Sequence, residues 1–91
     1  MNDEARDKRI HVRVTFPITK KGPYEGEVAP ETTVGTVLVE AIHHFEVQND
    51  SQFTYVLAHD GKEAADDLTI GSVAGDAHEI KFTLVKKITQ G

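Results

Sequence analysis

One stretch of this chain has the apolar spacing of a long helix, and it limits the folds open to the rest of the sequence. From Val34 to Phe45 the apolar residues follow the 3.6-residue period of one helical face. They are Val34, Val37, Leu38, Ala41, Ile42 and Phe45. After Pro30, the hydroxyl of Thr32 or Thr33 can accept a hydrogen bond from the first free amides of this helix. We therefore expect one long helix, whose stripe is the only surface large enough to cover a sheet.

Most other apolar residues alternate with polar ones, which is typical of half-buried strands. The alternation predicts strands over residues 10–16, 24–29, 53–58 and 79–87, and a short strand followed by a loop over 62–67. Pro17–Pro23 favours a turn that joins the first two strands into a hairpin, and residues 59–61 form the turn after the third. The small apolar group between Leu68 and Val73 suits a packed turn or a single helical turn.

A hairpin, a long helix and two or three further strands form the element order of a β-grasp. This is an α+β fold in which a mixed sheet of four to five strands packs on one helix. We expect the final strand beside the first and parallel to it, because the intervening helix supplies the crossover that parallel neighbours require.

Length and composition exclude several classes of protein. The 91 residues suffice for one small domain, which we assign to 9–87, with a flexible N-terminal extension (1–8) and an exposed C-terminal tail (88–91). The absence of Cys excludes disulfides, thiolate metal sites and a nucleophilic thiol. A net charge of -5 has the wrong sign for binding nucleic acid or anionic lipid, and no apolar run could span a membrane. We expect a cytoplasmic protein without nucleic-acid or membrane partners.

The polar residues lack the spacing of an enzyme or cofactor site. No two of the five His have the i, i+4 spacing of helical zinc ligands. Gly71 and Gly75 are not followed by the Lys-Ser or Lys-Thr of a phosphate loop. Ser, His and Asp occur in nearly every chain, so their presence is no evidence for a catalytic triad. We expect no metal, no cofactor and no intrinsic enzyme activity.

The chain resembles ubiquitin-like proteins over residues 10–91. Residues 27–34 (EVAPETTV) are similar to the family's second strand, proline, threonine cap and first core aliphatic of the helix. Residues 55–58 (YVLA) and 61–62 (GK) resemble its third strand and the following turn. Residues 68–70 (LTI) and 80–84 (IKFTL) resemble the segment before its last strand and that strand itself.

The C-terminal end departs from the family pattern. The penultimate residue is Gln90 where the family usually has a second glycine; the hairpin loop is longer, and there is an N-terminal extension. A single terminal glycine is also similar to the ubiquitin-like modifiers encoded in bacterial conjugation operons, which is the branch we favour.

The resemblance implies a protein modifier whose reactive group is the C-terminal carboxylate of Gly91. An E1-like activating enzyme would form an acyl-adenylate there, and an E2-like conjugating enzyme would pass the acyl group to a target amine as an isopeptide bond. A deconjugating peptidase and the target proteins are the other implied partners. Glycine suits this role because it lacks a Cβ, so the carbonyl can enter a narrow channel. Ile88, Thr89 and Gln90 would be the extended lead that the channel grips.

Two further sites follow from the resemblance. Lys62, just after Gly61, is a candidate acceptor, because family members often carry a chain-forming lysine there. The sheet face opposite the helix is a candidate partner surface, with a small apolar centre around Val56 and a basic rim. Its expected residues are His11, Arg13, Thr54, Val56, Ala58, Lys81, Thr83 and Val85. Lys86 and Lys87, beside the tail, could pair with an acidic groove on the activating enzyme.

Two alternative functions share this fold. A sulfur carrier would end in a thiocarboxylate, and Gln90 counts against it because such carriers typically resemble the Gly-Gly ending. A non-covalent interaction domain would use the Val56 face and have no role for the tail.

Overall fold

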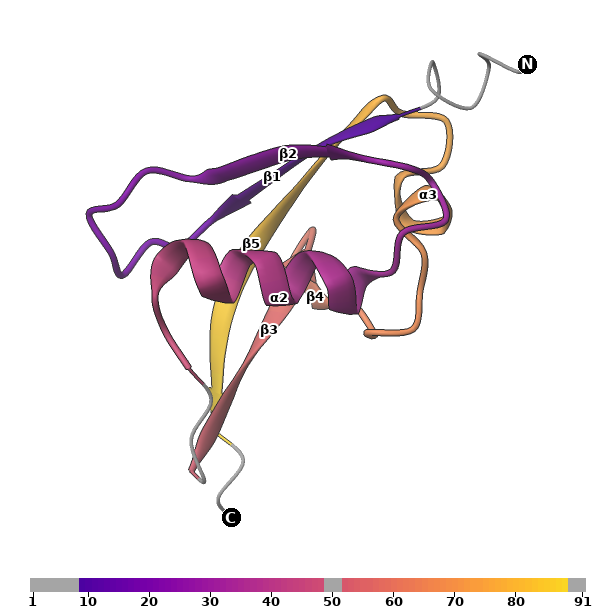
Figure 1. Ribbon diagram of the computed structural model, residues 1–91. Helices are drawn as coiled ribbons and strands as arrows, with labels where there is room; N and C mark the ends of the chain where they lie inside the picture. The colour runs from indigo at the N-terminus through magenta and orange to yellow at the C-terminus, as the bar shows by residue number, and fades with distance from the viewer. Residues whose placement is uncertain (1–8, 49–51, 89–91) are drawn as a thin grey trace.

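The computed structural model describes residues 9–48 and 52–88. In chain order, the elements within these residues are β1 (Ile10–Thr15), β2 (Tyr24–Val28), α2 (Val34–Phe45), β3 (Phe53–His59), β4 (Lys62–Glu63), α3 (Ile70–Ala74) and β5 (Glu79–Ile88). The strands form one sheet in the order β2-β1-β5-β3-β4, and α2 lies across one face of it (Figure 1). This confirms the predicted α+β fold and gives its mixed sheet five strands.

The N-cap of α2 is one of the two threonines that the sequence predicts, and the helix spans the predicted apolar stripe. Thr33 is the N-cap, and its hydroxyl accepts a hydrogen bond from the backbone N–H of Thr36 at 3.3 Å. Five of the six residues of the apolar stripe are buried, and Ile42 is partly buried. The helix ends at Glu46, whose left-handed backbone (φ 57°) lets its N–H donate to the carbonyl of His43.

The last strand, β5, lies in the middle of the sheet. It runs parallel to β1, with Val12 opposite Ile80, and antiparallel to β3, with Leu57 opposite Leu84. The parallel neighbour is the one expected from the crossover through the helix. Pairing of β5 continues to Ile88, one residue further than predicted, because the first residue of β3 lies opposite it.

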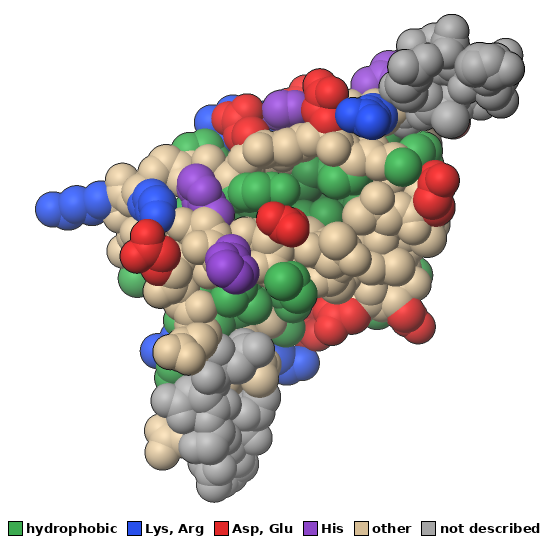
Figure 2. All heavy atoms as spheres, viewed as in Figure 1, with side chains coloured by type: hydrophobic (Ala, Val, Ile, Leu, Met, Phe, Trp, Pro, Cys, Tyr) green, Lys and Arg blue, Asp and Glu red, His purple; other side chains and the backbone are tan. Residues whose placement is uncertain are grey.

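The core lies between the sheet and α2. The buried residues of the three central strands alternate with more exposed ones, because successive side chains of a strand point to opposite faces. They are Ile10, Val12 and Val14 of β1, Tyr55 and Leu57 of β3, and Ile80, Phe82 and Leu84 of β5. Phe16 follows β1 and packs edge-on against Phe45 and Tyr55, with ring centroids 5.4 and 5.8 Å apart. On the helix side, apolar side chains remain visible between β2 and α2 and below the helix, with charged groups around them (Figure 2).

The first residues of α3 are hydrogen-bonded to the segment before α2. The N–H of Ile70 donates to the carbonyl of Thr32 at 2.7 Å, and the N–H of Gly71 donates to the carbonyl of Pro30 at 2.8 Å. Thr69 caps α3, the single helical turn expected for this part of the chain. A Cβ on Gly71 would lie only 2.9 Å from the Cβ of Pro30, so this close approach requires glycine.

The loop between β1 and β2 contacts the C-terminal end of α2. His44 Nε2 lies 2.9 Å from the carbonyl oxygen of Gly22, and Lys21 Nζ lies 3.0 Å from Glu46 Oε2. The hydrogen bond and the charge of Lys21 lower the pKa of Glu46. The sequence predicts a turn here, and the structure adds that this turn is joined to the helix end.

A two-residue turn, Asp60 and Gly61, joins β3 to β4. Both residues have positive φ, 54° and 82°, as a type I′ turn requires. His59 pairs with Lys62 across the turn, so the hairpin is tight. Asp-Gly is a favoured pair for this geometry, because glycine has no Cβ and aspartate tolerates the left-handed region.

Candidate functional site

The sheet face opposite α2 (the open face) carries all the residues expected on the partner surface. Strand register places Arg13 opposite Lys81 and Val56 opposite Val85. The remaining expected residues are His11, Thr54, Ala58 and Thr83, which occupy the same alternating positions of β1, β3 and β5. Their location agrees with the expectation, and their role in binding a partner stays a prediction.

Val56 and Val85 form the apolar centre of the open face. They lie opposite each other on β3 and β5, and Val85 is 36% exposed. The hollow beside them is lined by Val56, Ala58, Gly61, Glu63, Val85, Lys86 and Lys87. Lys87 Nζ lies 2.8 Å from Glu63 Oε1, so an ion pair borders the apolar floor. An apolar side chain of a partner would find both aliphatic contact and a charged edge at this hollow.

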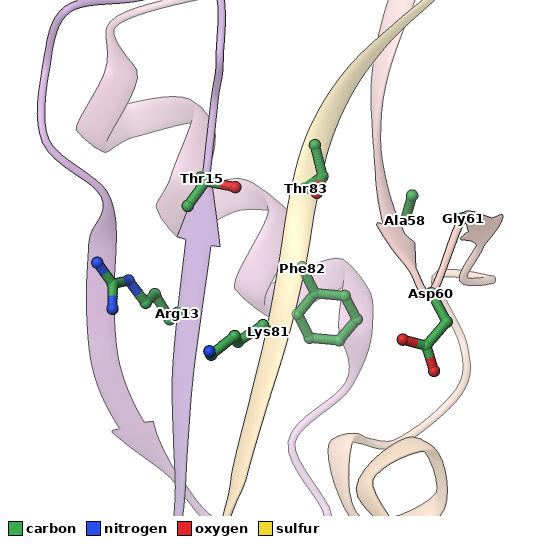
Figure 3. A pocket seen from close by; sticks show the side chains of 8 residues that line it. All are labelled: Arg13, Thr15, Ala58, Asp60, Gly61, Lys81, Phe82 and Thr83. Atoms are coloured by element: carbon green, nitrogen blue, oxygen red, sulfur yellow. The ribbon is translucent and has the colours of Figure 1, made fainter.

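A second, more polar hollow lies on the other side of Ala58. It is lined by Arg13, Thr15, Ala58, Asp60, Gly61, Lys81, Phe82 and Thr83 (Figure 3). Lys81 leans from β5 toward β1, and the Asp60 carboxylate lies on the side of its turn that faces β5 (Figure 3). The hydroxyls of Thr15 and Thr83 come from neighbouring strands. This hollow can therefore offer hydrogen-bond donors and acceptors, but no reactive constellation.

The rim of the open face has mixed charge, and the expectation of a basic rim is wrong. His11 Nε2 lies 3.2 Å from Glu25 Oε1, and Arg13 Nε lies 3.8 Å from Glu25 Oε2. Glu63 pairs with Lys87 on the other side. The expectation considered only the three central strands, whereas both carboxylates come from the edge strands β2 and β4. Because these ion pairs are exposed, they define the charge pattern of the face more than its stability.

Arg13 combines this exposed ion pair with an unsatisfied atom. Its Nε is buried and has no hydrogen-bond partner among the residues that the structure describes. A buried donor without an acceptor is unfavourable, and this nitrogen is too enclosed for a partner's acceptor to reach it unless the side chain moves.

Several residues that line the two hollows were outside the expected surface, among them Thr15, Asp60 and Glu63. Asp60 and Glu63 belong to the turn and to the short strand β4, and Thr15 is the last residue of β1. The sequence did carry a signal for Glu63: an Asp-Gly turn of two residues pairs the strands on either side of it in fixed register. That register puts Glu63 opposite Ala58, on the open face.

The candidate acceptor Lys62 is the first residue of β4. It is exposed and follows the Asp60-Gly61 turn directly, at the edge of the sheet. Its amine is therefore accessible to an acyl donor, and its role as an acceptor stays a prediction.

The predicted tail begins where β5 ends. Ile88 is paired with Phe53 and is 67% exposed, at the end of the sheet that extends beyond α2 (Figure 1). Next to it, Lys86 Nζ lies 4.0 Å from the centroid of the Phe53 ring. The other predicted tail positions, Thr89, Gln90 and Gly91, lie outside the described residues.

Nowhere in residues 9–48 and 52–88 do three or more His, Asp or Glu side chains lie close enough together to hold a metal ion. Neither α2 nor α3, the helices of these same residues, is long and apolar enough to cross a bilayer. The expected absence of metal and cofactor stays a prediction.

Solved structures with the same arrangement include several ubiquitin-like proteins. A ubiquitin of Caldiarchaeum subterraneum matches with a TM-score of 0.71 and 26% identity, covering 91% of this chain and 99% of that one. ATG8 of Trypanosoma brucei matches with a TM-score of 0.69 and 9% identity, covering 98% of this chain and 82% of that one. A designed protein based on ubiquitin has a TM-score of 0.66 and 12% identity, covering 92% and 94%. No family model and no curated protein matches the chain.

These structures and the sheet order lead to one conclusion about the fold. A five-stranded mixed sheet with its last strand in the middle and one helix across it is the ubiquitin-like β-grasp. The chain therefore has the fold of ubiquitin-like proteins, and its open face and the end of β5 are its candidate functional surfaces.

Proposed function

We propose that this chain is a ubiquitin-like protein modifier that is joined through Gly91 to amines of target proteins. The supporting observation is the similarity to an archaeal ubiquitin along nearly the full length of both chains. The exposed end of β5 at Ile88 agrees with this role, because a modifier has to present its C-terminal residues to other enzymes. Among modifiers, we favour the branch that bacteria encode together with conjugation enzymes.

In this proposal the chain acts as a substrate and supplies no catalytic group. The Gly91 carboxylate attacks the α-phosphate of ATP on an E1-like enzyme, and pyrophosphate leaves. An enzyme nucleophile then displaces AMP from the acyl carbon, and an E2-like enzyme carries the acyl group to a target amine, where an isopeptide bond forms. Ile88, Thr89 and Gln90 provide the extended approach to the active site, and a peptidase reverses the reaction.

The open face is the contact surface for these enzymes in our proposal. Val56 and Val85 provide a central apolar anchor, and the half-exposed guanidinium of Arg13 offers charged donors on the same face. Lys81 and Thr83 surround this centre with polar groups that set orientation. The candidate acceptor Lys62 lies opposite His59, so a second modifier would be attached at the edge of the sheet, on the side away from the open face.

Recovery of conjugates from native cells tests the proposal. A tagged full-length chain is expressed in its own cells, purified under denaturing conditions and digested with trypsin. Cleavage after Lys87 should leave the remnant Ile-Thr-Gln-Gly on the acceptor lysine of each target, which mass spectrometry identifies directly.

Matched variants show which residues the reaction needs. Deletion of Gly91 should abolish the remnant and the higher-mass species without changing the unfolding curve. Val56→Ser with Val85→Ser should reduce conjugation, whereas Val39→Ser, an exposed valine on the helix, should leave it unchanged. Conjugation that persists after deletion of Gly91 would reject the proposal.

The same samples separate the alternative functions. A sulfur carrier would show a free protein heavier by about 16 Da, from exchange of one oxygen for sulfur. A non-covalent domain would give no remnant, and a chain ending at Lys87 would keep full activity.

A further inference from the structure

The turn between β3 and β4 holds the only Asp-Gly pair of the sequence, which contains no Asn-Gly. The Asp60 side chain is 88% exposed. Within the described residues, no atom beyond the chain neighbours lies within 4 Å of where a Cβ on Gly61 would sit. We propose that this turn is a site of spontaneous backbone modification, where the amide nitrogen of Gly61 attacks the Asp60 carboxyl carbon to form a cyclic imide that the hairpin retains.

The proposed reaction is a condensation that needs no second substrate. A bond forms between Gly61 N and Asp60 Cγ, and one Cγ–O bond of the protonated carboxyl breaks. The leaving hydroxyl combines with the amide proton, so that one water is released. His59 Nε2 lies 3.8 Å from Asp60 Oδ2 and can supply a proton to the carboxylate when the imidazole is charged. Addition of water to the imide reopens it, either to aspartate or to isoaspartate.

The turn geometry favours this ring. Closing the five-membered imide fixes ψ of the aspartyl residue near about -120°, the value of the first central residue of a type II′ turn. That residue also requires φ near about +60°, and Asp60 already has φ 54°. Type I′ and type II′ are the two favoured two-residue hairpin turns, and they differ mainly by rotation of the central peptide.

Gly61 makes rotation of the central peptide of the turn feasible. The second central residue changes from positive φ in type I′ to negative φ in type II′, and only glycine adopts both signs with little cost. The strand that follows is also short. Because β4 consists of Lys62 and Glu63, and one further bond joins the N–H of Ala64 to the carbonyl of Leu57, opening of the turn has to break few backbone pairs.

The modification would change both hollows of the open face. Gly61 lines both of them, and Asp60 lines the polar one. The imide removes the negative charge of Asp60, and the isoaspartate lengthens the backbone of a turn that spans two residues. The inference depends on the turn alone, so it stands whether or not the chain is a modifier.

The purified full-length chain provides the test. The folded protein and the same protein unfolded in guanidinium are incubated in mildly acidic buffer for days and followed by intact mass and peptide mapping. We expect a species lacking one water to accumulate in the folded chain, to map to residues 60–61, and to disappear after unfolding. Hydroxylamine should trap it as a hydroxamate at Asp60.

Two variants with the same turn keep the inference falsifiable. Asp60→Asn should form the same imide with loss of ammonia at least about tenfold faster, because its leaving group departs more easily. Asp60→Glu keeps the charge but would need a six-membered ring, so it should give no product. The inference is overturned if the folded chain reacts more than about tenfold slower than the unfolded one, if Asp60→Asn gives no imide, or if the product maps elsewhere.

Discussion

The two faces of this sheet are made by neighbouring residues but have different physical roles. On β3, Leu57 is fully buried under the helix, and Val56 is half-buried on the open face. On β5, Phe82 is buried and Lys81 is exposed. Stability therefore depends on one set of positions and surface chemistry on the alternate set. This separation lets the open face change its charge and shape without loss of the fold.

The largest expected effect comes from truncating neighbours on opposite faces. Leu57→Ala should lower the free energy of unfolding by about 2–5 kcal/mol, because it removes buried methyl groups and leaves a cavity. Val56→Ala should lower it by less than about 1 kcal/mol. Urea unfolding measures both. Equal losses would show that the open face is also part of the packed core.

A substitution of Gly71 tests the packing away from the open face. Gly71→Ala should destabilise the domain by about 1–3 kcal/mol, because the new Cβ would lie 2.9 Å from Pro30 Cβ and 3.0 Å from its carbonyl oxygen. Hydrogen exchange at Ile70 and Gly71 should become faster, since their bonds to residues 30–32 would be disturbed. Unchanged exchange would contradict the proposed close approach.

On the open side, a glycine substitution should act through the backbone alone. Gly61→Ala meets no neighbouring atom, but φ at Gly61 is 82°, so the expected loss is about 1–2 kcal/mol. Gly22→Ala is the matched control, because that loop glycine has an equally open site and no positive φ. Thermal unfolding should show a lower midpoint for Gly61→Ala only.

The smallest effect concerns Tyr24, at the edge of the covered face. Burial, and secondly the charge of Glu40, raise the pKa of Tyr24. A group with a raised folded pKa contributes stability that is fully present below its unfolded pKa and is lost as the pH rises through the folded pKa. Phenolate absorbance in a Tyr55→Phe background should give a midpoint above that of free tyrosine, and Glu40→Gln should lower it. A midpoint at the free value would contradict the burial of this ring.

Much of the fold could be predicted because it depends on short-range patterns. The 3.6-residue stripe locates α2, and the alternation in 79–87 locates β5 and assigns Phe82 and Leu84 to the core. Contacts between distant segments could not be predicted. The bond between His44 and Gly22 and the joining of Gly71 to Pro30 depend on how the chain is folded back, which no local period encodes.

The sequence predicted which residues share the open face, but it did not predict the acidic residues at the rim of that face. Alternation correctly placed Val56, Arg13 and Lys81 on one face. The mixed rim was missed because Glu25 and Glu63 come from other strands, and ion-pair geometry requires the register of the whole sheet.

The position of β5 has a consequence for biosynthesis. Among the strands that the structure describes, the central strand β5 is translated last, and it pairs with β1, which is translated first. The nascent chain therefore cannot complete this sheet until β5 has been translated and has left the exit tunnel. A ribosome that stalls before Phe82 releases a chain without a core, which cellular proteases can remove.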